Sequence, residues 1–303
     1  MKKVRSLRLP YLVAVLIMLL AACSDNNKID FTSSDSANVE GEGTSDAYAA
    51  DAMDVSVDVV GAVPASLYSG RENETIQPSL YAAYEKFKCA TITITRGPNS
   101  TKDNPQGTIT IVYPDDGSCK DGRGISRKGT ITITYTGPRF AVGSKIITTF
   151  TNFFIGGVKV EGTHTLTNVT PTNQAYPRFN VVITDGKLTF LNGKTVTRTQ
   201  NFTHEWQRAT NPLEDKWVLL TGGTAAGTTR EGAEYLMSVT KDLVYSRPCQ
   251  ISNKTFIAVS GEKTFVSGNK QITINYGDGT CDNKVTITIN GKSTEVEIKG
   301  DGN

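Results

Sequence analysis

The sequence has few of the residue patterns that mark an enzyme. It contains two histidines, His164 and His204, and neither belongs to an HExxH motif or to a close cluster of cysteine and histidine. A catalytic zinc site therefore has little to build on. No G-x-S-x-G motif occurs, and the glycine-rich stretch at 221–228 lacks the G-K-[ST] ending of a phosphate-binding loop. These absences favour a non-catalytic protein, and we assign no catalytic residue, metal or cofactor.

The sequence also lacks a hydrophobic run long enough for a transmembrane helix. The apolar run from Tyr11 to Ala22 has 12 residues, whereas a helix that spans the bilayer core needs about 20. Basic residues precede the run at positions 2, 3, 5 and 8. A basic start followed by a short apolar run is typical of an export signal, so we expect residues 1–22 to be a signal peptide.

The end of this expected signal resembles the lipobox of bacterial lipoproteins. The four residues are Leu20-Ala21-Ala22-Cys23. The resemblance implies cleavage before Cys23, whose thiol would carry diacylglycerol and whose new amino group would carry a further acyl chain such as palmitate. Two or three acyl chains anchor a protein stably in a membrane. The alternative is an ordinary secretory signal with a chance cysteine.

The residue after Cys23 bears on which membrane would hold the anchor. Retained inner-membrane lipoproteins often have aspartate at this position, whereas this chain has Ser24. The resemblance therefore implies the outer membrane, and it leaves open whether the body faces the periplasm or the outside.

The net charge of the chain is small. The sequence has 32 lysines and arginines against 30 aspartates and glutamates, and loss of residues 1–22 would remove four of the positive charges and none of the negative, leaving a net charge of −2. A nearly neutral chain gives no reason to expect a nucleic acid as partner.

The composition changes twice before the main body of the chain. Residues 23–45 are polar, acidic and short of large apolar side chains, so we expect a flexible tether. Residues 46–84 are expected to be a lead-in that is partly helical, with Ser45 as a candidate N-cap of a short helix.

From residue 85 onward the sequence predicts an all-β domain that extends to residue 303. Short segments alternate in period two and are rich in threonine, isoleucine, valine and aromatic residues. Four turn dipeptides separate them: Gly156-Gly157, Asp185-Gly186, Asn192-Gly193 and Asn290-Gly291. Such short turns join antiparallel neighbours. We expect an antiparallel meander that forms a long twisted sheet, a two-layer sandwich or a barrel; exposed edges need cover, which favours sheets packed on each other.

Four cysteines remain besides Cys23, namely Cys89, Cys119, Cys249 and Cys281. An even number in an oxidising compartment predicts disulfides, with four buried free thiols as the alternative. The separations of 30 residues (89 to 119) and 32 residues (249 to 281) would return each pair to the same end of a hairpin. This geometry favours the pairs 89–119 and 249–281 among the three pairings that exist.

The two cysteine pairs lie in segments that echo each other. Residues 108–113 (TITIVY) match residues 271–276 (QITINY), and in both segments a glycine turn, a cysteine and another strand follow. We therefore predict a duplicated, disulfide-linked β unit at about residues 89–137 and 249–300. The alternative is chance similarity, because strand sequences are repetitive.

Three sequence segments in the β-rich part of the chain resemble a group of uncharacterised lipoproteins of Bacteroidota. They are DGRGISRKGTITITYTG, TFTNFFIGGVKVEGTHTLTN and YGDGTCDNKVTITINGK. The resemblance covers most of the chain from about residue 85. It implies an envelope location and a β-rich body, and it offers no catalytic residue to transfer.

Acidic residues in glycine-rich segments are candidates for calcium ligands. They are Asp115, Asp116, Asp121, Asp278 and Asp282. Aspartate and glycine are also the usual turn formers, and no 12-residue calcium loop is present, so we expect turns at these positions.

Aromatic residues beyond position 200 form a candidate glycan-binding platform, with packing inside the sheet as the alternative. They are Trp206, Trp217, Tyr235 and Tyr245. Acid pairs that could hydrolyse a glycosidic bond are Glu214/Asp215 and Glu231/Glu234, although nothing in the sequence distinguishes them from surface acids.

Together these patterns predict a lipid-anchored envelope protein with a non-catalytic binding or structural role. The expected partners are the membrane, through Cys23, and a glycan or an envelope protein. The alternatives are a surface hydrolase that acts on glycans and an adhesin-like module stabilised by calcium.

Overall fold

The computed structural model of the protein describes residues 32–63, 74–76, 85–121, 124–253, 255 and 257–298. The expected signal peptide and Cys23 lie outside the described residues. The helices are α2 (Ser33–Gly61), η3 (Glu85–Phe87), η4 (Pro212–Glu214) and α3 (Arg247–Asn253). The strands are β1 (Glu74–Ile76), β2 (Thr91–Arg96), β3 (Gln106–Tyr113), β4 (Arg127–Thr136), β5 (Lys145–Ile155), β6 (Val158–Asn168), β7 (Arg178–Thr189), β8 (Thr195–Gln207), β9 (Lys216–Leu219), β10 (Thr224–Thr228), β11 (Glu234–Ser246), β12 (Ser260–Ser267), β13 (Lys270–Asp278), β14 (Lys284–Ile289) and β15 (Lys292–Glu297).

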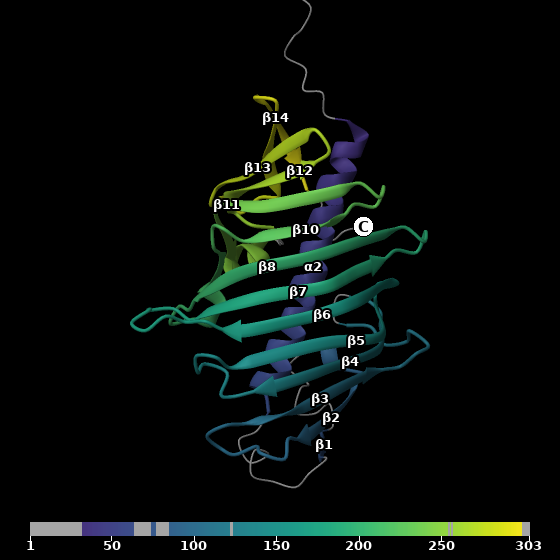
Figure 1. Ribbon diagram of the computed structural model, residues 1–303, viewed down its shortest axis with the longest axis vertical. Helices are drawn as coiled ribbons and strands as arrows, with labels where there is room; N and C mark the ends of the chain where they lie inside the picture. Colours follow the sequence, from purple (N-terminus) through teal and green to yellow (C-terminus); the bar gives the residue numbers. More distant parts are fainter. Residues whose placement is uncertain are drawn as a thin grey trace, which may run out of the picture.

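The strands form one antiparallel sheet that follows the order of the chain (Figure 1). Strands β9 and β10 share one position between β8 and β11, because a turn at 220–223 interrupts what is otherwise one strand. The prediction of an all-β antiparallel fold is confirmed, in the form of a long twisted sheet. In the described part of the chain α2, and not a second sheet, covers one face.

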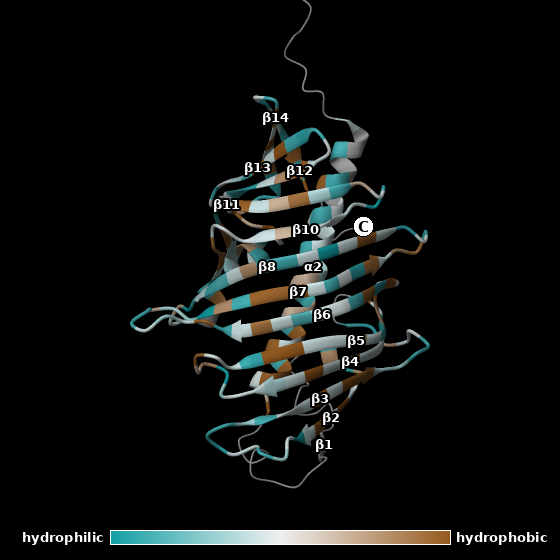
Figure 2. Ribbon diagram, viewed as in Figure 1, coloured by the Kyte–Doolittle hydropathy of each residue, from teal (hydrophilic) through white to brown (hydrophobic). Residues whose placement is uncertain are grey.

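The two faces of the sheet follow from the alternation of side chains. On the inner face, direct cross-strand partners form one continuous row from β2 to β14. The row has one residue at each strand position, and all twelve residues are buried. The row is Ile94, Ile109, Ile133, Thr148, His164, Ile183, Gln200, Ala225, Met237, Phe265, Ile272 and Ile289. The outer face carries a row of threonines from β2 to β7, none of them buried: Thr93, Thr110, Thr132, Thr149, Thr163 and Thr184. Figure 2 shows this alternation as stripes along the strands.

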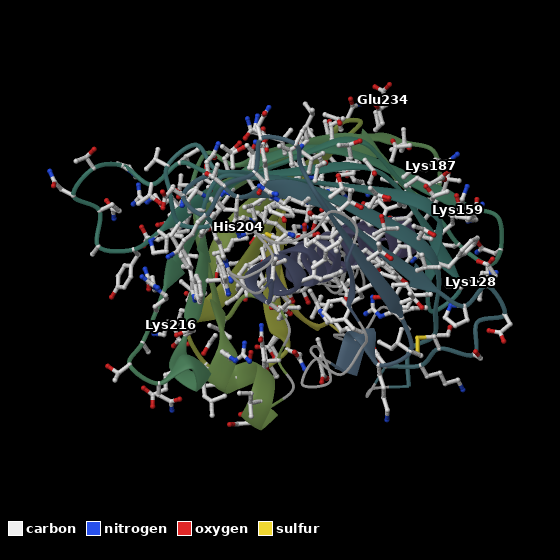
Figure 3. The ribbon with its side chains drawn as sticks, turned by 90° about the horizontal axis from the view of Figure 1, so that it is seen from below. Lys128, Lys159, Lys187, His204, Lys216 and Glu234 are labelled. Carbon is white, nitrogen blue, oxygen red and sulfur yellow. A yellow bond between two sulfur atoms is a disulfide. The ribbon has the colours of Figure 1, made fainter. Side chains whose placement is uncertain are left out.

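Bulges bend the sheet so that it arches over α2 (Figure 3). The register shifts between most neighbouring strands from β4 to β13. At the first shift Gly129 has a φ of 90°, and a Cβ there would lie 2.0 Å from the carbonyl oxygen of Asn152. Such a position accepts only glycine, and the extra residue of a bulge increases local bending.

One predicted turn is a bulge instead. Asp185-Gly186 lies inside β7, which pairs with β8 on both sides of it. The φ of Asp185 is 52°, so the conformation expected of a hairpin turn is used to bend a continuous strand. The other predicted turn dipeptides join β5 to β6, β7 to β8, and β14 to β15.

Helix α2 corrects the prediction of a tether at 23–45. Residues 33–45 form its first half, and Thr32 and Asp35 close its start with a reciprocal capping box. Two acidic residues in the described part of that segment, Asp35 and Glu42, contact basic residues of the sheet, as when Asp35 accepts from Nζ of Lys270 at 2.8 Å. The predicted lead-in at 46–84 contains the rest of α2 and strand β1. Helix α3 was not predicted from the sequence. No helix among the described residues is long and apolar enough to cross a membrane.

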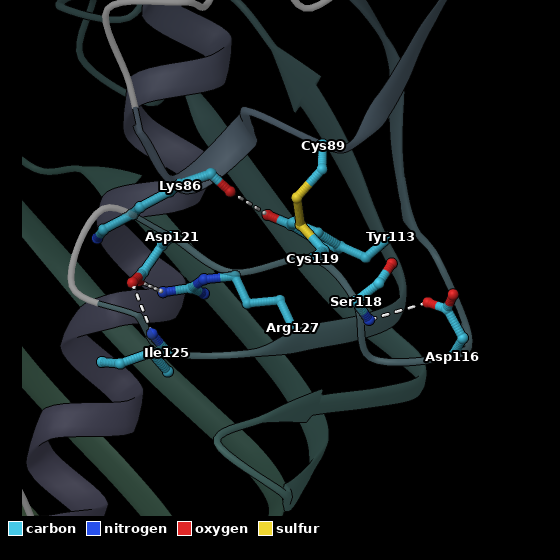
Figure 4. The surroundings of a disulfide bond; sticks show 9 residues. All are labelled: Lys86, Cys89, Tyr113, Asp116, Ser118, Cys119, Asp121, Ile125 and Arg127. Carbon is cyan, nitrogen blue, oxygen red and sulfur yellow. Dashed lines mark hydrogen bonds and ion pairs between the residues drawn. A yellow bond between two sulfur atoms is a disulfide. The ribbon is translucent and has the colours of Figure 1, made fainter.

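Both predicted disulfides are present. Cys89 joins Cys119 with a Cα–Cα distance of 5.5 Å, and Cys249 joins Cys281 at 5.0 Å. The first lies beside a buried ion pair between Arg127 and Asp121 (Figure 4). Because strand directions alternate, the two disulfides lie at opposite ends of the strands as well as in opposite halves of the sheet.

The two echoed segments do not form a repeated three-dimensional unit. Ile109 and Ile272 lie in the same inner row, and in both segments the next strand follows on the side toward β15. However, β3 and β13 run in opposite directions, because an odd number of antiparallel steps separates them. The strand direction is reversed between the two segments, while the buried face and the side of the next strand stay the same. The two arrangements are therefore related as mirror images, and no rotation superposes them. The predicted duplication is therefore limited to sequence and disulfide spacing.

Candidate functional site

Exposed apolar side chains gather at one end of the strands, which we call the aromatic end. The β4–β5, β6–β7, β8–β9 and β11–β12 connections lie there because alternate turns of a meander share an end. Nine large apolar side chains are exposed in the described part of the chain, and six belong to these connections: Phe140, Val142, Val169, Tyr176, Leu213 and Ile251. Concentrations of this kind are typical of interaction sites, whereas single exposed apolar residues are ordinary.

Four aromatic rings form the aromatic cluster at this end. Trp206 of β8 and Trp217 of β9 are direct cross-strand partners and stack with centroids 5.2 Å apart and planes at 11°. Phe179 of β7 lies 6.4 Å from Trp217. Phe140, from the β4–β5 connection, lies 6.0 Å from Trp206 and is 48% exposed. The cluster therefore extends from a rigid strand pair to an exposed ring.

Two arginines cover the outer part of the cluster. The guanidinium carbon of Arg139 lies 5.2 Å from the ring centre of Phe140 and 5.4 Å from that of Trp206. The corresponding distances from Arg208 are 5.3 and 5.5 Å. Both groups are within the range of a cation–π interaction, so the cluster combines apolar faces with positive charge.

A buried carboxylate fixes the orientation of Trp206. Asp215 is 7% exposed, and its two oxygens accept from Nε1 of Trp206 at 2.9 Å and from the backbone N–H of Ala209 at 2.8 Å. A ring held by hydrogen bonding and stacking loses little freedom when a ligand binds, so the cluster is pre-organised.

The sequence identified only part of this cluster. Trp206 and Trp217 belong to it, and Tyr245 lies beside Trp217 in the register of β11 and β9, where burial raises the pKa of its phenol. Tyr235 lies at the opposite end, buried and stacked on Phe265 at 5.1 Å. Phe140 and Phe179 were missed, although each ends a Pro-Arg-Phe tripeptide, at 138–140 and at 177–179, and this repeated tripeptide was a signal that could have found them.

The structure places one predicted acid pair beside the aromatic cluster and the other at the opposite end of the strands. The hydrogen bonds described above occupy both oxygens of Asp215, while Glu214 is exposed. Glu231 pairs with Lys194 at 3.2 Å at the opposite end, and Glu234 is exposed there.

The candidate calcium ligands perform turn functions. Asp116, Asp278 and Asp282 each accept from a backbone N–H two residues later, at 2.9 to 3.3 Å. Asp121 accepts from the N–H of Ile125 and pairs with Arg127, and Asp115 is exposed. Within the described ranges no three histidine, cysteine, aspartate or glutamate side chains converge as metal ligands would.

Both histidines lie on the inner face of the sheet. Burial, together with the charge of Arg198, lowers the pKa of His164 to about 4. Burial also lowers the pKa of His204 to about 4, against the opposing influence of Asp46. Both are therefore neutral at physiological pH, and His164 packs edge-on against Phe150 with centroids 5.1 Å apart.

An ion-pair network joins α2 to the middle of the inner face. Glu42 and Asp46 of α2 pair with Arg198 of β8 and Lys263 of β12, and the side chains of Glu42 and Lys263 are each 2% exposed. Burial alone would raise the pKa of Asp46, but the charges of Lys263 and Arg198 outweigh it and hold the pKa below its ordinary value. Every charge is compensated within the network, which makes it a means of docking α2 and not an open binding site.

Comparisons with known proteins add no relative. No family model matches the chain, and no curated protein and no solved structure is significantly similar to it.

Proposed function

We propose that this protein is a lipid-anchored outer-membrane lipoprotein with a non-catalytic binding role, and that the aromatic end holds a glycan of the envelope or its surroundings. The observation that carries the proposal is the aromatic cluster, with the exposed ring of Phe140 beside a fixed Trp206. The lipobox at residues 20–23 supports the anchor.

A glycan fits the cluster because sugar rings have apolar faces and polar edges. The rings of Phe140 and Trp206 offer flat apolar surface, and aromatic side chains with a polar group suit such mixed ligands. The surrounding connections supply further exposed side chains, including Tyr176, which is 37% exposed. The fixed indole of Trp206 lowers the cost of ordering the site.

The two alternatives have less support. A hydrolase needs two carboxyl groups that face the substrate, and the acid hydrogen-bonded to the cluster, Asp215, is 7% exposed with each oxygen already accepting a hydrogen bond. A calcium-dependent adhesin needs several oxygen ligands at one point, and the aspartates nominated for that role cap turns.

Binding to a panel of polysaccharides tests the role of the aromatic end. We expect Phe140→Ala to weaken binding by about tenfold, because truncation of an exposed aromatic anchor removes its contact area. Leu191→Ala is the matched control, since Leu191 is 86% exposed in the β7–β8 hairpin at the opposite end. Unchanged affinity in Phe140→Ala would contradict the proposal.

Labelling with palmitate tests the anchor. We expect the wild-type chain to incorporate the label and to sediment with membranes, and Cys23→Ala to do neither. A Cys23→Ala variant that remains bound to the membrane would contradict the proposed lipid anchor. Protease treatment of intact cells then separates an outward-facing body, which is digested, from a periplasmic one, which is protected.

A further inference from the structure

We propose that the ligand of the aromatic end is an acidic polysaccharide, whose carboxylate or sulfate groups bind Arg208 while a sugar ring stacks on Phe140. The inference rests on the proposed function and narrows it to one class of glycan. The geometry that points to it is the position of an exposed guanidinium over two aromatic rings.

Arg208 is placed as an anion receptor. It follows β8 at the start of the β8–β9 connection and is exposed. Among the described residues no carboxylate lies within ion-pair distance of it, in contrast to Arg178, which pairs with Glu205 at 2.8 Å. The rings of Phe140 and Trp206 hold the guanidinium in place and leave its donor groups for a ligand. Arginine binds carboxylate and sulfate-like oxygens through two parallel hydrogen bonds.

The charges around Arg208 favour an anion. Lys216 is exposed at the same end of the strands (Figure 3), but as the partner of Gln207 it lies on the sheet face opposite to that of Trp206 and Trp217, so it adds positive charge at a distance and no direct contact. Glu205 is compensated by its ion pair with Arg178, whereas Asp215 accepts only from neutral donors, which compensate no charge. Glu214 is the other acid of this connection, so two acidic residues stand against the three basic residues Arg139, Arg208 and Lys216, an excess of one positive charge.

Other basic residues of this end have acidic neighbours. The charges of Arg139 and Arg247 act to lower the pKa of Asp58 in α2, and the charge of Arg247 acts to lower that of Asp54. Arg208 has no comparable influence on either carboxylate. The anion site is therefore assigned to Arg208, and Arg139 packs against the rings beside its acidic neighbours.

The experiment compares one polymer in two charge states. The probes are polygalacturonate, the same polymer after chemical reduction of its carboxyl groups to alcohols, and a sulfated polysaccharide. Wild-type protein should bind both acidic probes at least about tenfold more tightly than the reduced polymer, the increment of roughly one charge-assisted contact. Binding to the acidic probes should weaken between about 50 mM and about 300 mM NaCl, since salt screens exposed charges.

Variants separate charge from stacking. Arg208→Ala should reduce the preference for the acidic probes to within about twofold, while Phe140→Ala should weaken all binding. Lys194→Ala removes an exposed lysine at the opposite end and should change nothing. Because Arg208 is exposed, we expect the Arg208→Ala variant to have the same melting temperature as the wild type. This measurement is the control for an intact fold.

The outcomes distinguish the two proposals. Equal binding of the acidic and the reduced polymer, with loss of both in Phe140→Ala, would overturn the acidic ligand and leave the glycan-binding role standing. An undiminished acidic preference in Arg208→Ala would overturn the assignment of the anion site. Failure of all three probes to bind would overturn both proposals.

Discussion

The inner face of the sheet is stabilised differently at its two ends and in its middle. Around β2–β4 and around β13–β14 it is mainly apolar, and these regions belong to two separate clusters of buried residues. The charged exception is Arg127 of β4, which pairs with Asp51 of α2. Between them the buried row carries Thr148, His164 and Gln200. Helix α2 follows the same division, with Val55 and Val59 over the first cluster and Glu42 over the polar middle.

The difference shows how one helix docks on a sheet that changes character along its length. Apolar burial stabilises through area and has no preferred partner. Buried ion pairs contribute little net stability, but loss of one partner leaves an unpaired charge in a poorly solvated site. The ends therefore secure α2 against the sheet, while the middle fixes its register.

The sharpest test of this contrast removes one charge from the polar middle. Lys263→Met leaves Glu42 and Asp46 with Arg198 alone, and we expect it to lower the free energy of unfolding by about 4 kcal/mol. Urea denaturation followed by circular dichroism measures the change.

A double variant supplies its control. Glu42→Leu combined with Lys263→Met removes both charges and should recover most of the lost stability, because apolar residues replace a buried pair at little cost. A double variant that is as unstable as Lys263→Met would show that the pair itself contributes the stability.

Equivalent truncations in the apolar ends should be alike and insensitive to pH. Ile111 of β3 and Ile274 of β13 are each at most 1% exposed, and we expect Ile111→Ala and Ile274→Ala each to cost about 3 kcal/mol. The loss should be the same at acidic and neutral pH, since no titrating group is removed. Denaturation at both pH values checks this, and a strong pH dependence would break the contrast with the middle.

The histidines make the polar middle sensitive to mild acid. Folding holds the pKa of each histidine near 4, against 6.5 for a free side chain. The unfolded chain therefore binds more protons in this interval, and stability falls as the pH drops from about 6.5 to 4. We expect His164→Gln to reduce that fall by about 2 kcal/mol. Equal slopes of stability against pH in variant and wild type would contradict the burial of a neutral His164.

The smallest effect concerns Asp58, near the end of α2. Burial, with the charge of Asp54, raises its pKa to about 6. The folded state thus holds this proton more tightly than the unfolded state, and stability declines as the pH rises from about 4 to 6. Because Asp58 is partly solvated, we expect Asp58→Asn to stabilise by only about 1 kcal/mol at pH 7. At about pH 2.5, well below the pKa of the carboxyl group in both states, melting should show no difference.

Local patterns predicted the local structure well. Alternating side chains predicted the strands, and cysteine separation predicted both disulfides. The first half of α2 was missed because its acids pair with residues that are distant in the sequence, as Glu42 does with Arg198 and Lys263. The aromatic cluster was found only in part, because Phe140 enters from a connection four strands away from β8. The opposite hand of the echoed segments depends on the number of strands between them, which no local pattern records.

The orientation of α2 has a mechanical consequence. The helix begins beside β13, through Asp35 and Lys270, and reaches β4 through Asp51 and Arg127, so it lies along the long axis of the sheet and across the strands (Figure 1). In a chain held through Cys23, a load that pulls the sheet along its long axis would enter α2 at Thr32 and act along the helix axis. Such a force would act in shear on all the contacts between α2 and the sheet at the same time, and would not break them one after another.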